Sequence, residues 1–249
     1  MYNPYSLEGK VILVTGASSG IGRVVAIECS KLGATLHIVD RDQEKLSETL
    51  SMLERGDHRE HVCDMTDEAQ LASLVEDLPV LDGYSNCINV AKSMFVKFLN
   101  QKTIDEILQV NTVAPMSLTQ GLVKKKKLNK HSSVVFTSSL AGVYNVHYGD
   151  ALNAVSMGAI NAFVKSAALD LSMQGIRVNC VNPGVIATEA TFEGSVLSEE
   201  ELIEKQKFFP LHRFGQPKDV AMAIIFLLSD ASSWITGVGM PVDGGYTLL

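Results

Sequence analysis

The chain of 249 residues contains no long hydrophobic run, no close pair of cysteines and no excess of positive charge. No stretch approaches the ~20 consecutive apolar residues that span a bilayer, and no charged-then-apolar leader is present, so we expect no membrane segment and a cytoplasmic location. The net charge of −7 disfavours a nucleic-acid partner, because the phosphates would repel the protein. The cysteines (Cys29, Cys63, Cys87 and Cys180) are scattered, which indicates buried free thiols in a reducing compartment and no metal site.

The sequence also lacks a Pro/Ser-rich linker, a repeat or a low-complexity segment, so residues 1–249 are expected to form one domain. Short apolar runs alternate with segments of helical periodicity. Strands are predicted at 11–14, 36–39, 60–63, 84–88, 134–137, 177–181 and 239–242, and helices at 21–32, 43–53, from a Thr66 cap to 78, 103–123, 151–173 and 217–228. This alternation predicts an α/β fold: a single doubly wound, Rossmann-type parallel sheet with helices on both faces.

A glycine-rich segment, Thr15–Gly22 (TGASSGIG), lies between the first strand and the first helix. Its glycines let the backbone turn tightly and approach a pyrophosphate, which then meets the free N–H groups of the helix start. Asp40 ends the second strand, where an acid binds both adenosine ribose hydroxyls and repels a 2′-phosphate. This favours NAD over NADP, although the Arg41 guanidinium could offset a phosphate. Alternatively, Asp40–Asp42 is a solvated turn that caps the next helix.

Further motifs follow in order: Asp64 after the third strand, Asn111 in Val-Asn-Thr, Ser139 in Thr-Ser-Ser, Asn182–Thr188 (NPGVIAT) and Val242–Gly245 (VDGG). With the glycine segment, they resemble the short-chain dehydrogenase/reductase family over nearly the whole chain. The resemblance implies that Asn111 bends a central helix and anchors a water relay, and that Ser139 is a catalytic serine holding the substrate carbonyl. It implies cofactor contacts from Gly16, Ser18, Ser19, Gly20, Ile21, Gly22, Asp40, Arg41, Asp64, Met65, Asn86, Pro183, Gly184, Ile186 and Thr188.

Length and C-terminal ending most resemble the tetrameric 3-oxoacyl-carrier-protein reductase and sugar-alcohol dehydrogenase types of that family. The resemblance therefore implies a homo-oligomer, either a tetramer or a dimer. Its interface would contain the helix of Met157 and the neighbouring helix at 103–123. The implied ligands are a nicotinamide dinucleotide and a small carbonyl or alcohol, the latter under a substrate lid at about 189–212. In that lid, Phe192, Phe208 and Phe209 could face an apolar ligand or pack the lid onto the body.

The family's catalytic Tyr-x-x-x-Lys pair has no counterpart in this sequence. The surrounding residues place Asn153 at the tyrosine and Met157 at the lysine, and none of the six tyrosines has a lysine four residues later. In the family the tyrosine moves the hydroxyl proton, while the lysine lowers its pKa from about 10 and binds the nicotinamide ribose. Asn153 cannot act as an acid or base, and Met157 has no charge and no strong donor. Loss of a general acid reduces a rate by about 10²–10⁴-fold.

A second departure lies after the fourth strand, where Asn86-Cys-Ile-Asn89 replaces the family's Asn-Asn-Ala-Gly. Asn89 would crowd the nicotinamide ribose where glycine normally lets it approach. We therefore expect a pseudoenzyme, which binds the dinucleotide but is inactive or severely impaired in hydride transfer. The alternative is a functional NAD(P)-dependent oxidoreductase in which Tyr148 or His147, just before the long helix, is a substitute proton donor. The missing partner cation favours a simple packing role for both side chains.

Overall fold

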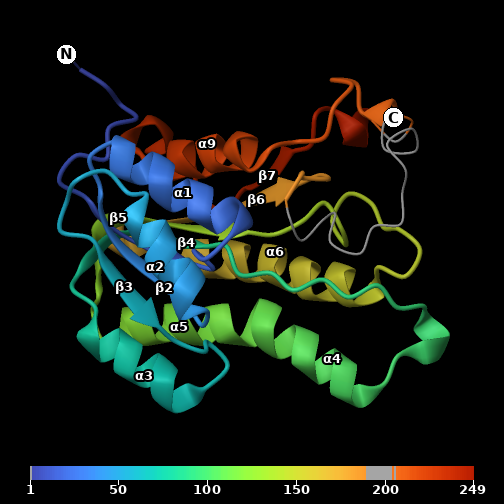
Figure 1. The fold of residues 1–249 in the computed structure, drawn as a ribbon, viewed down its shortest axis with the longest axis horizontal. Helices are drawn as coiled ribbons and strands as arrows, with labels where there is room; N and C mark the ends of the chain where they lie inside the picture. The colour runs from blue at the N-terminus through green and yellow to red at the C-terminus, as the bar shows by residue number, and fades with distance from the viewer. Residues whose placement is uncertain (1, 189–203, 205) are drawn as a thin grey trace.

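One parallel sheet of seven strands forms the centre of the protein (Figure 1). The structure is a computed structural model that describes residues 2–188, 204 and 206–249. The strands are β1 (Val11–Thr15), β2 (Thr35–Asp40), β3 (Arg59–Val62), β4 (Leu81–Asn86), β5 (Leu128–Thr137), β6 (Arg177–Pro183) and β7 (Gly239–Val242). Their order across the sheet is β3-β2-β1-β4-β5-β6-β7, and all neighbouring pairs are parallel. The predicted α/β class and parallel sheet are confirmed.

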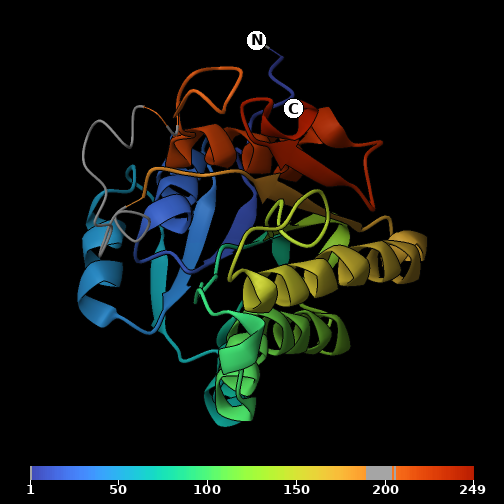
Figure 2. The same ribbon diagram turned by 90° about the vertical axis from the view of Figure 1, so that its right-hand side faces the viewer.

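Helices cover both faces of the sheet, as Figure 2 shows from the side. They are α1 (Gly20–Lys31), α2 (Gln43–Ser51), α3 (Glu68–Asp77), α4 (Gln101–Leu108), α5 (Ala114–Lys124), α6 (Ala151–Leu171) and α9 (Pro217–Leu228). One core cluster joins the sheet to α1, α2 and α9, and a second joins it to α3, α5 and α6. Because both faces are covered, the central strands are almost continuously apolar, which explains why their runs are visible in the sequence.

The helix expected over 103–123 is interrupted in its middle. A π-helical turn, Gln109–Val113, separates α4 from α5 and contains the buried Asn111. Pro115 follows in the first turn of α5, where its missing N–H group removes one α-helical hydrogen bond. Such π-turns often occur at functional sites. The apolar periodicity runs through this region, so the pattern alone predicts one helix, whereas the bend that the family resemblance implies at Asn111 agrees with the interruption.

The start of α3 corrects a second expectation, since Asp67 and not Thr66 caps the helix. Asp67 accepts hydrogen bonds from the N–H groups of Ala69 (2.9 Å) and Gln70 (3.0 Å). The hydroxyl of Thr66 instead donates to Asp64 Oδ1 at 2.7 Å. A carboxylate also interacts more favourably with the helix dipole than a hydroxyl does.

Most of the lid expected at about 189–212 lies outside the described residues, including Phe192. Of the other two aromatic residues named for it, Phe208 is exposed and Phe209 is buried. The Phe209 ring packs at a T-shaped angle on Phe214 and stacks on Tyr246, with centroids 5.6 and 5.0 Å apart. Of the two alternatives expected for Phe209, it therefore packs onto the body of the protein.

The four cysteines are free thiols, of which Cys29, Cys63 and Cys180 are buried and Cys87 is half-buried. Within residues 2–188, 204 and 206–249, no three His, Cys, Asp or Glu side chains are grouped so that they could hold a metal ion. In that same part of the chain, no helix has the length and apolar character needed to cross a membrane.

Candidate nucleotide and substrate site

The glycine segment forms a tight loop between β1 and α1 that leaves no room for a side chain at Gly16 or Gly22. Gly16 has a φ of +72°, and its N–H group donates to Val39 O at 2.9 Å. A Cβ atom added to Gly16 would lie 2.9 Å from the carbonyl carbon of Cys87, and one added to Gly22 would lie 2.0 Å from Gly16 O. Glycine is therefore required at both positions. Ser19 precedes α1 without a side-chain cap, so the first N–H groups of the helix remain available to a phosphate.

Asp40 lies against this loop at the end of β2. Its carboxylate accepts hydrogen bonds from the N–H groups of Ser18 (3.2 Å), Arg41 (2.8 Å) and Asp42 (3.2 Å). Asp42 itself caps α2 by accepting from the Lys45 N–H group at 3.1 Å, so the interpretation as a helix cap is confirmed for Asp42. The Arg41 side chain is exposed. Asp40 thus borders the position expected for an adenosine ribose.

Asp64 follows β3 on the same edge of the sheet. Hydrogen bonds from the Thr66 hydroxyl (2.7 Å) and N–H group (2.9 Å), with a smaller effect of the Arg41 cation, hold the pKa of Asp64 below its usual value. The neighbouring Met65 side chain is buried in the core. Asp64 therefore stays ionised. Met65 packs in the core and anchors the loop there.

Asn86 lies inside the protein at the end of β4. It is 1% exposed, and its Oδ1 atom accepts hydrogen bonds from the Thr15 hydroxyl at 2.9 Å and the Tyr84 hydroxyl at 3.3 Å. The side chain therefore braces β1 against β4, and its contact with a cofactor remains a prediction. Asn89, three residues further along, is exposed.

The loop after β6 meets the glycine segment from the opposite side. A Cβ atom added to Gly20 would lie 3.6 Å from Cγ2 of Thr188. Gly184 donates from its N–H group to Val242 O at 3.1 Å, which ties this loop to β7. Ile186 is buried and pairs with Gly215. The segments carrying the predicted contacts with both ends of a dinucleotide are thus adjacent at the carboxyl ends of the strands.

A cavity of about 250 Å³ opens beside these segments. Its walls come from the loops after β4, β5 and β6, from the start of α6 and from the C-terminal turn. Ser139, Asn153, Pro183 and Gly184, all predicted from the sequence, line it together. Ligands of open α/β sheets bind in such a crevice beyond the carboxyl ends of the strands.

Ser139 and Asn153 are the two predicted catalytic-position side chains in this cavity. Ser139 Oγ accepts a hydrogen bond from the Ala141 N–H group at 3.1 Å, which leaves its own proton available to another acceptor. Asn153 Oδ1 is buried and has no hydrogen-bond partner among the described residues. A native buried polar atom of this kind usually finds a partner in a water or a ligand.

Met157 and Asn111 lie behind the cavity and do not line it. Met157 is fully buried, and its carbonyl oxygen accepts hydrogen bonds from the Ser138 hydroxyl (3.1 Å) and the Asn161 amide (3.0 Å). Asn111, also fully buried, bonds to the Val90 backbone and donates to Ser156 Oγ at 3.1 Å. Asn111 thus joins the loop after β4 to α6.

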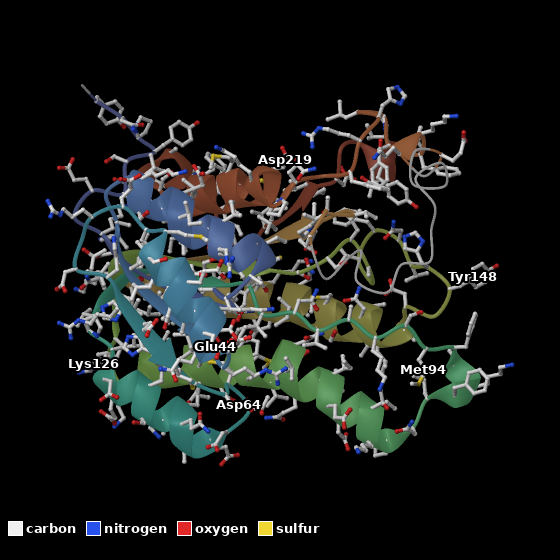
Figure 3. The ribbon with its side chains drawn as sticks, in the orientation of Figure 1. Glu44, Asp64, Met94, Lys126, Tyr148 and Asp219 are labelled. Carbon is white, nitrogen blue, oxygen red and sulfur yellow. The ribbon has the colours of Figure 1, made fainter. Side chains whose placement is uncertain are left out.

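The two candidate substitute acids occupy the rim. Tyr148 is 94% exposed, and Figure 3 shows its side chain pointing away from the body. His147 is also exposed, with its ring centroid 6.1 Å from that of Tyr246. Sequence reasoning missed several further lining residues, among them Lys92, Asn145, Asp150 and Tyr246, because they come from separate segments of the chain and carry no motif.

The sequence and the fold of this chain match those of a known protein family. The family profile described as enoyl-(acyl carrier protein) reductase matches residues 16–247. The chain belongs to the short-chain dehydrogenase/reductase family. It is 32% identical over 248 residues to the 3-oxoacyl-(acyl-carrier-protein) reductase of Thermotoga maritima, with 97% of this chain and 99% of the relative covered. It is 31% identical to a tropinone reductase homologue of Arabidopsis thaliana, with 98% and 94% covered.

Solved structures of this family have the same fold. A family member from Francisella tularensis matches with a TM-score of 0.84 and 28% identity, over 96% of this chain and 99% of its own. A candidate NAD(P)-dependent gluconate 5-dehydrogenase from Beutenbergia cavernae, with NADP bound at low occupancy, matches with a TM-score of 0.89 and 25% identity, over 99% and 100% of the two chains. The protein thus has the dinucleotide-binding fold of an NAD(P)-dependent oxidoreductase family.

Proposed function

We propose that this protein binds a nicotinamide dinucleotide and is inactive or severely impaired in hydride transfer. The observation that carries the proposal is the full burial of Met157, at the position where the family resemblance expects the lysine. A fully buried thioether carries no charge to a ribose or to a neighbouring acid. Binding of the dinucleotide is supported by the glycine loop, which has room for a phosphate, and by the carboxylates of Asp40 and Asp64.

The chemical reason for impaired transfer is the absence of a proton donor at Asn153. Ketone reduction needs a proton at the new hydroxyl, and alcohol oxidation needs a base for the same proton. The amide of Asn153 and the hydroxyl of Ser139 bind an oxygen atom but supply no acid of suitable strength. The group held there would be a small carbonyl or alcohol.

A preference for NAD over NADP is part of the proposal. The Asp40 carboxylate next to Ser18 N would repel a 2′-phosphate at the adenosine ribose. Arg41 has an exposed side chain in the same turn, so its guanidinium would weaken the preference.

A second candidate function is slow oxidoreductase activity with a substitute acid. Of the two side chains considered, His147 is favoured by its position in the cavity wall beside Tyr246. Tyr148 also lines the cavity, but its nearly complete exposure disfavours a fixed catalytic position. Activity by this route would fall strongly in His147→Gln.

Association into a homo-oligomer, a dimer or a tetramer, completes the proposal. The outer face of α6 exposes Val155 and Leu169, and the neighbouring helical segments expose Val113 and Met116. Apolar side chains gathered on two adjacent helices are typical of an interface between subunits. The family resemblance points to the same pair of helices.

The test combines binding with turnover. NADH and NADPH are titrated by calorimetry, and a panel of ketones is assayed with the unaltered protein, with Asn153→Tyr and with Asn153→Tyr/Met157→Lys. We expect NADH binding in all three, and turnover only after substitution. Because a lysine at the buried position 157 could destabilise the fold, thermal unfolding of each variant is the control. Turnover of the unaltered protein equal to that of the double variant would refute the impairment, and failure to bind either dinucleotide would refute the whole proposal.

A further inference from the structure

The cavity wall contains an exposed lysine that has no ion-pair partner among the described residues. Lys92 lies in its wall and forms no salt bridge with any residue in the described part of the chain. The protein as a whole is acidic, with a net charge of −7. A lone cation in the wall of a cavity on an acidic protein favours an anionic ligand at that place.

The loop that carries Lys92 is fixed at both ends. Val90 donates its N–H group to Asn111 Oδ1 at 2.8 Å and accepts from Asn111 Nδ2 at 2.9 Å. Met94 donates its N–H group to Gly149 O at 2.8 Å, and Figure 3 shows Met94 on the same side of the molecule as Tyr148. The backbone of Lys92 is therefore held by a braced loop, while its side chain is exposed at the rim of the cavity, so ligand binding would not have to order the loop itself.

The rest of the cavity wall is suited to hydroxyl groups. Nine of the fifteen described residues that line it have polar or ionisable side chains. Asp150 is the residue before α6, and its carboxylate makes no capping hydrogen bond to the helix. Asn145 and Ser139 contribute an amide and a hydroxyl to the same wall. A hydroxylated ligand would donate to Asp150 and accept from the other two.

An acyl chain would leave the polar groups of this wall without partners. Its methylene groups would displace water from Lys92, Asp150 and the amides without replacing the lost hydrogen bonds, which is unfavourable. The volume of about 250 Å³ is also small beside the ~300–1,000 Å³ of pockets for drug-sized ligands. A phosphate would bring two negative charges to one cation and place them near Asp150. One carboxylate matches the single lysine better.

We infer that the cavity binds a small polyhydroxylated carboxylic acid. Its carboxylate pairs with Lys92, its hydroxyls bond to Asp150 and Asn145, and its remaining oxygen reaches Ser139 and Asn153. The inference rests on the proposed function, since it names the ligand class of the cavity beside the dinucleotide site. It does not require that hydride transfer takes place.

The test separates charge from hydroxyl groups with three six-carbon probes. D-gluconate carries both, sorbitol carries hydroxyls without the carboxylate, and hexanoate carries the carboxylate on an alkyl chain. Each is titrated by calorimetry with and without NADH, and binding in either condition counts. We expect gluconate to bind about fivefold more tightly than either sorbitol or hexanoate.

Two lysine variants test whether Lys92 causes the preference for gluconate. Lys92→Met removes the cation in the cavity, whereas Lys97→Met removes one that lies over the Phe98 ring, 4.7 Å from its centroid, and not in the cavity wall. Lys92→Met should abolish the advantage of gluconate over sorbitol, and Lys97→Met should keep it. Equal affinities for the three probes, tightest binding of hexanoate, no binding of any probe, or equal effects of the two variants would overturn the inference.

A separate titration keeps the inference distinct from the proposed function. Lys92→Met should bind NADH with the affinity of the unaltered protein, because the proposed dinucleotide contacts come from the glycine loop, Asp40 and Asp64 and do not include Lys92. If the unaltered protein fails to bind NADH but binds gluconate through Lys92, the dinucleotide proposal fails and the ligand class stands. If it binds NADH but no probe, the ligand class fails and the dinucleotide proposal stands.

Discussion

Asn111 holds the backbone of Val90 through two hydrogen bonds, one accepted from its N–H group at 2.8 Å and one donated to its carbonyl at 2.9 Å. A side-chain amide thus replaces the backbone partner that Val90 would have in a strand. Because Asn111 also bonds to Ser156, it connects the π-turn, which lies behind the cavity, to two segments that border it: the loop after β4 and α6. This brace is independent of any catalytic use of Asn111.

Removal of this brace should destabilise the protein. Asn111→Leu leaves both polar groups of Val90 unpaired, so we expect the free energy of unfolding to fall by about 1–3 kcal/mol. Asn111→Asp keeps the acceptor but buries a carboxylate and sets one of its oxygens against Val90 O, so at neutral pH it should destabilise the protein at least as much as leucine. Urea unfolding measures both. A leucine variant as stable as the unaltered protein would show that the loop does not depend on the amide.

Addition of a single methyl group to the glycine loop, at Gly22, should weaken nucleotide binding. In Gly22→Ala the new Cβ atom would lie 2.0 Å from Gly16 O, so the loop must move away from the start of α1. We expect the affinity for NADH to fall at least about tenfold. Gly158→Ala is the matched control, because its nearest neighbour would be Gly142 O at 3.7 Å. This control should keep NADH affinity and gain about 0.5–1 kcal/mol of helix stability.

Stability should depend on pH through a histidine pair on β2 and β3. His37 Nδ1 lies 2.9 Å from His61 Nε2, and burial, with smaller effects of His61 and Arg59, lowers the pKa of His37 from 6.5 to about 4; Asp57 opposes this. Burial also lowers the pKa of His61, against an opposing effect of Asp77. Between pH 6.5 and about pH 4, the ordinary and the lowered pKa of His37, the unfolded chain binds more protons than the folded one. Stability is therefore complete above pH 6.5 and declines as the pH falls towards 4.

The size of this decline should be on the order of 1–3 kcal/mol between these two pH values. His37→Asn should flatten the dependence, whereas substitution of the exposed His212 by asparagine should leave it unchanged. Thermal unfolding at several pH values measures the slopes. Identical slopes for both variants would mean that other groups cause the acid sensitivity.

The proposed subunit interface predicts that a surface charge dissociates the protein. Val155 is 61% exposed on α6, so Val155→Asp should not disturb the fold of a single subunit. In an oligomer it would bury an unpaired carboxylate and shift the mass measured by light scattering to that of the monomer. Met52→Asp, at the exposed end of α2, is the control and should leave the mass unchanged. A monomeric unaltered protein would contradict the oligomer directly.

Much of the fold was predictable because both faces of the sheet are covered, which makes the strands apolar along their length. The first six residues of β5, 128–133, were missed because they contain three exposed polar residues followed by two serines. Apolar periodicity continues through Gln109–Val113, so the pattern alone predicted one helix there, and only the family resemblance at Asn111 indicated a bend. These failures concern places where backbone geometry departs from the regular pattern.

The candidate site was predictable only as far as its motifs extend. Ser139, Asn153 and Pro183 could be named from local sequence, and the structure brings them to one cavity. Lys92 and Tyr246 could not be named, since only the folded chain places them in that wall. The burial of Met157 likewise depends on packing against other elements. The sequence shows that the family's tyrosine and lysine are replaced, and the folded structure shows which side chains line the cavity instead.

The central claim is that binding and chemistry are separated in this protein. The most direct test measures both in one sample: NADH affinity by calorimetry, then the rate of NADH oxidation with a ketone panel at saturating NADH, for the unaltered protein and for Asn153→Tyr/Met157→Lys. We predict that both bind NADH and that the unaltered protein is slower by at least about 100-fold. Equal rates in the two proteins would contradict the account.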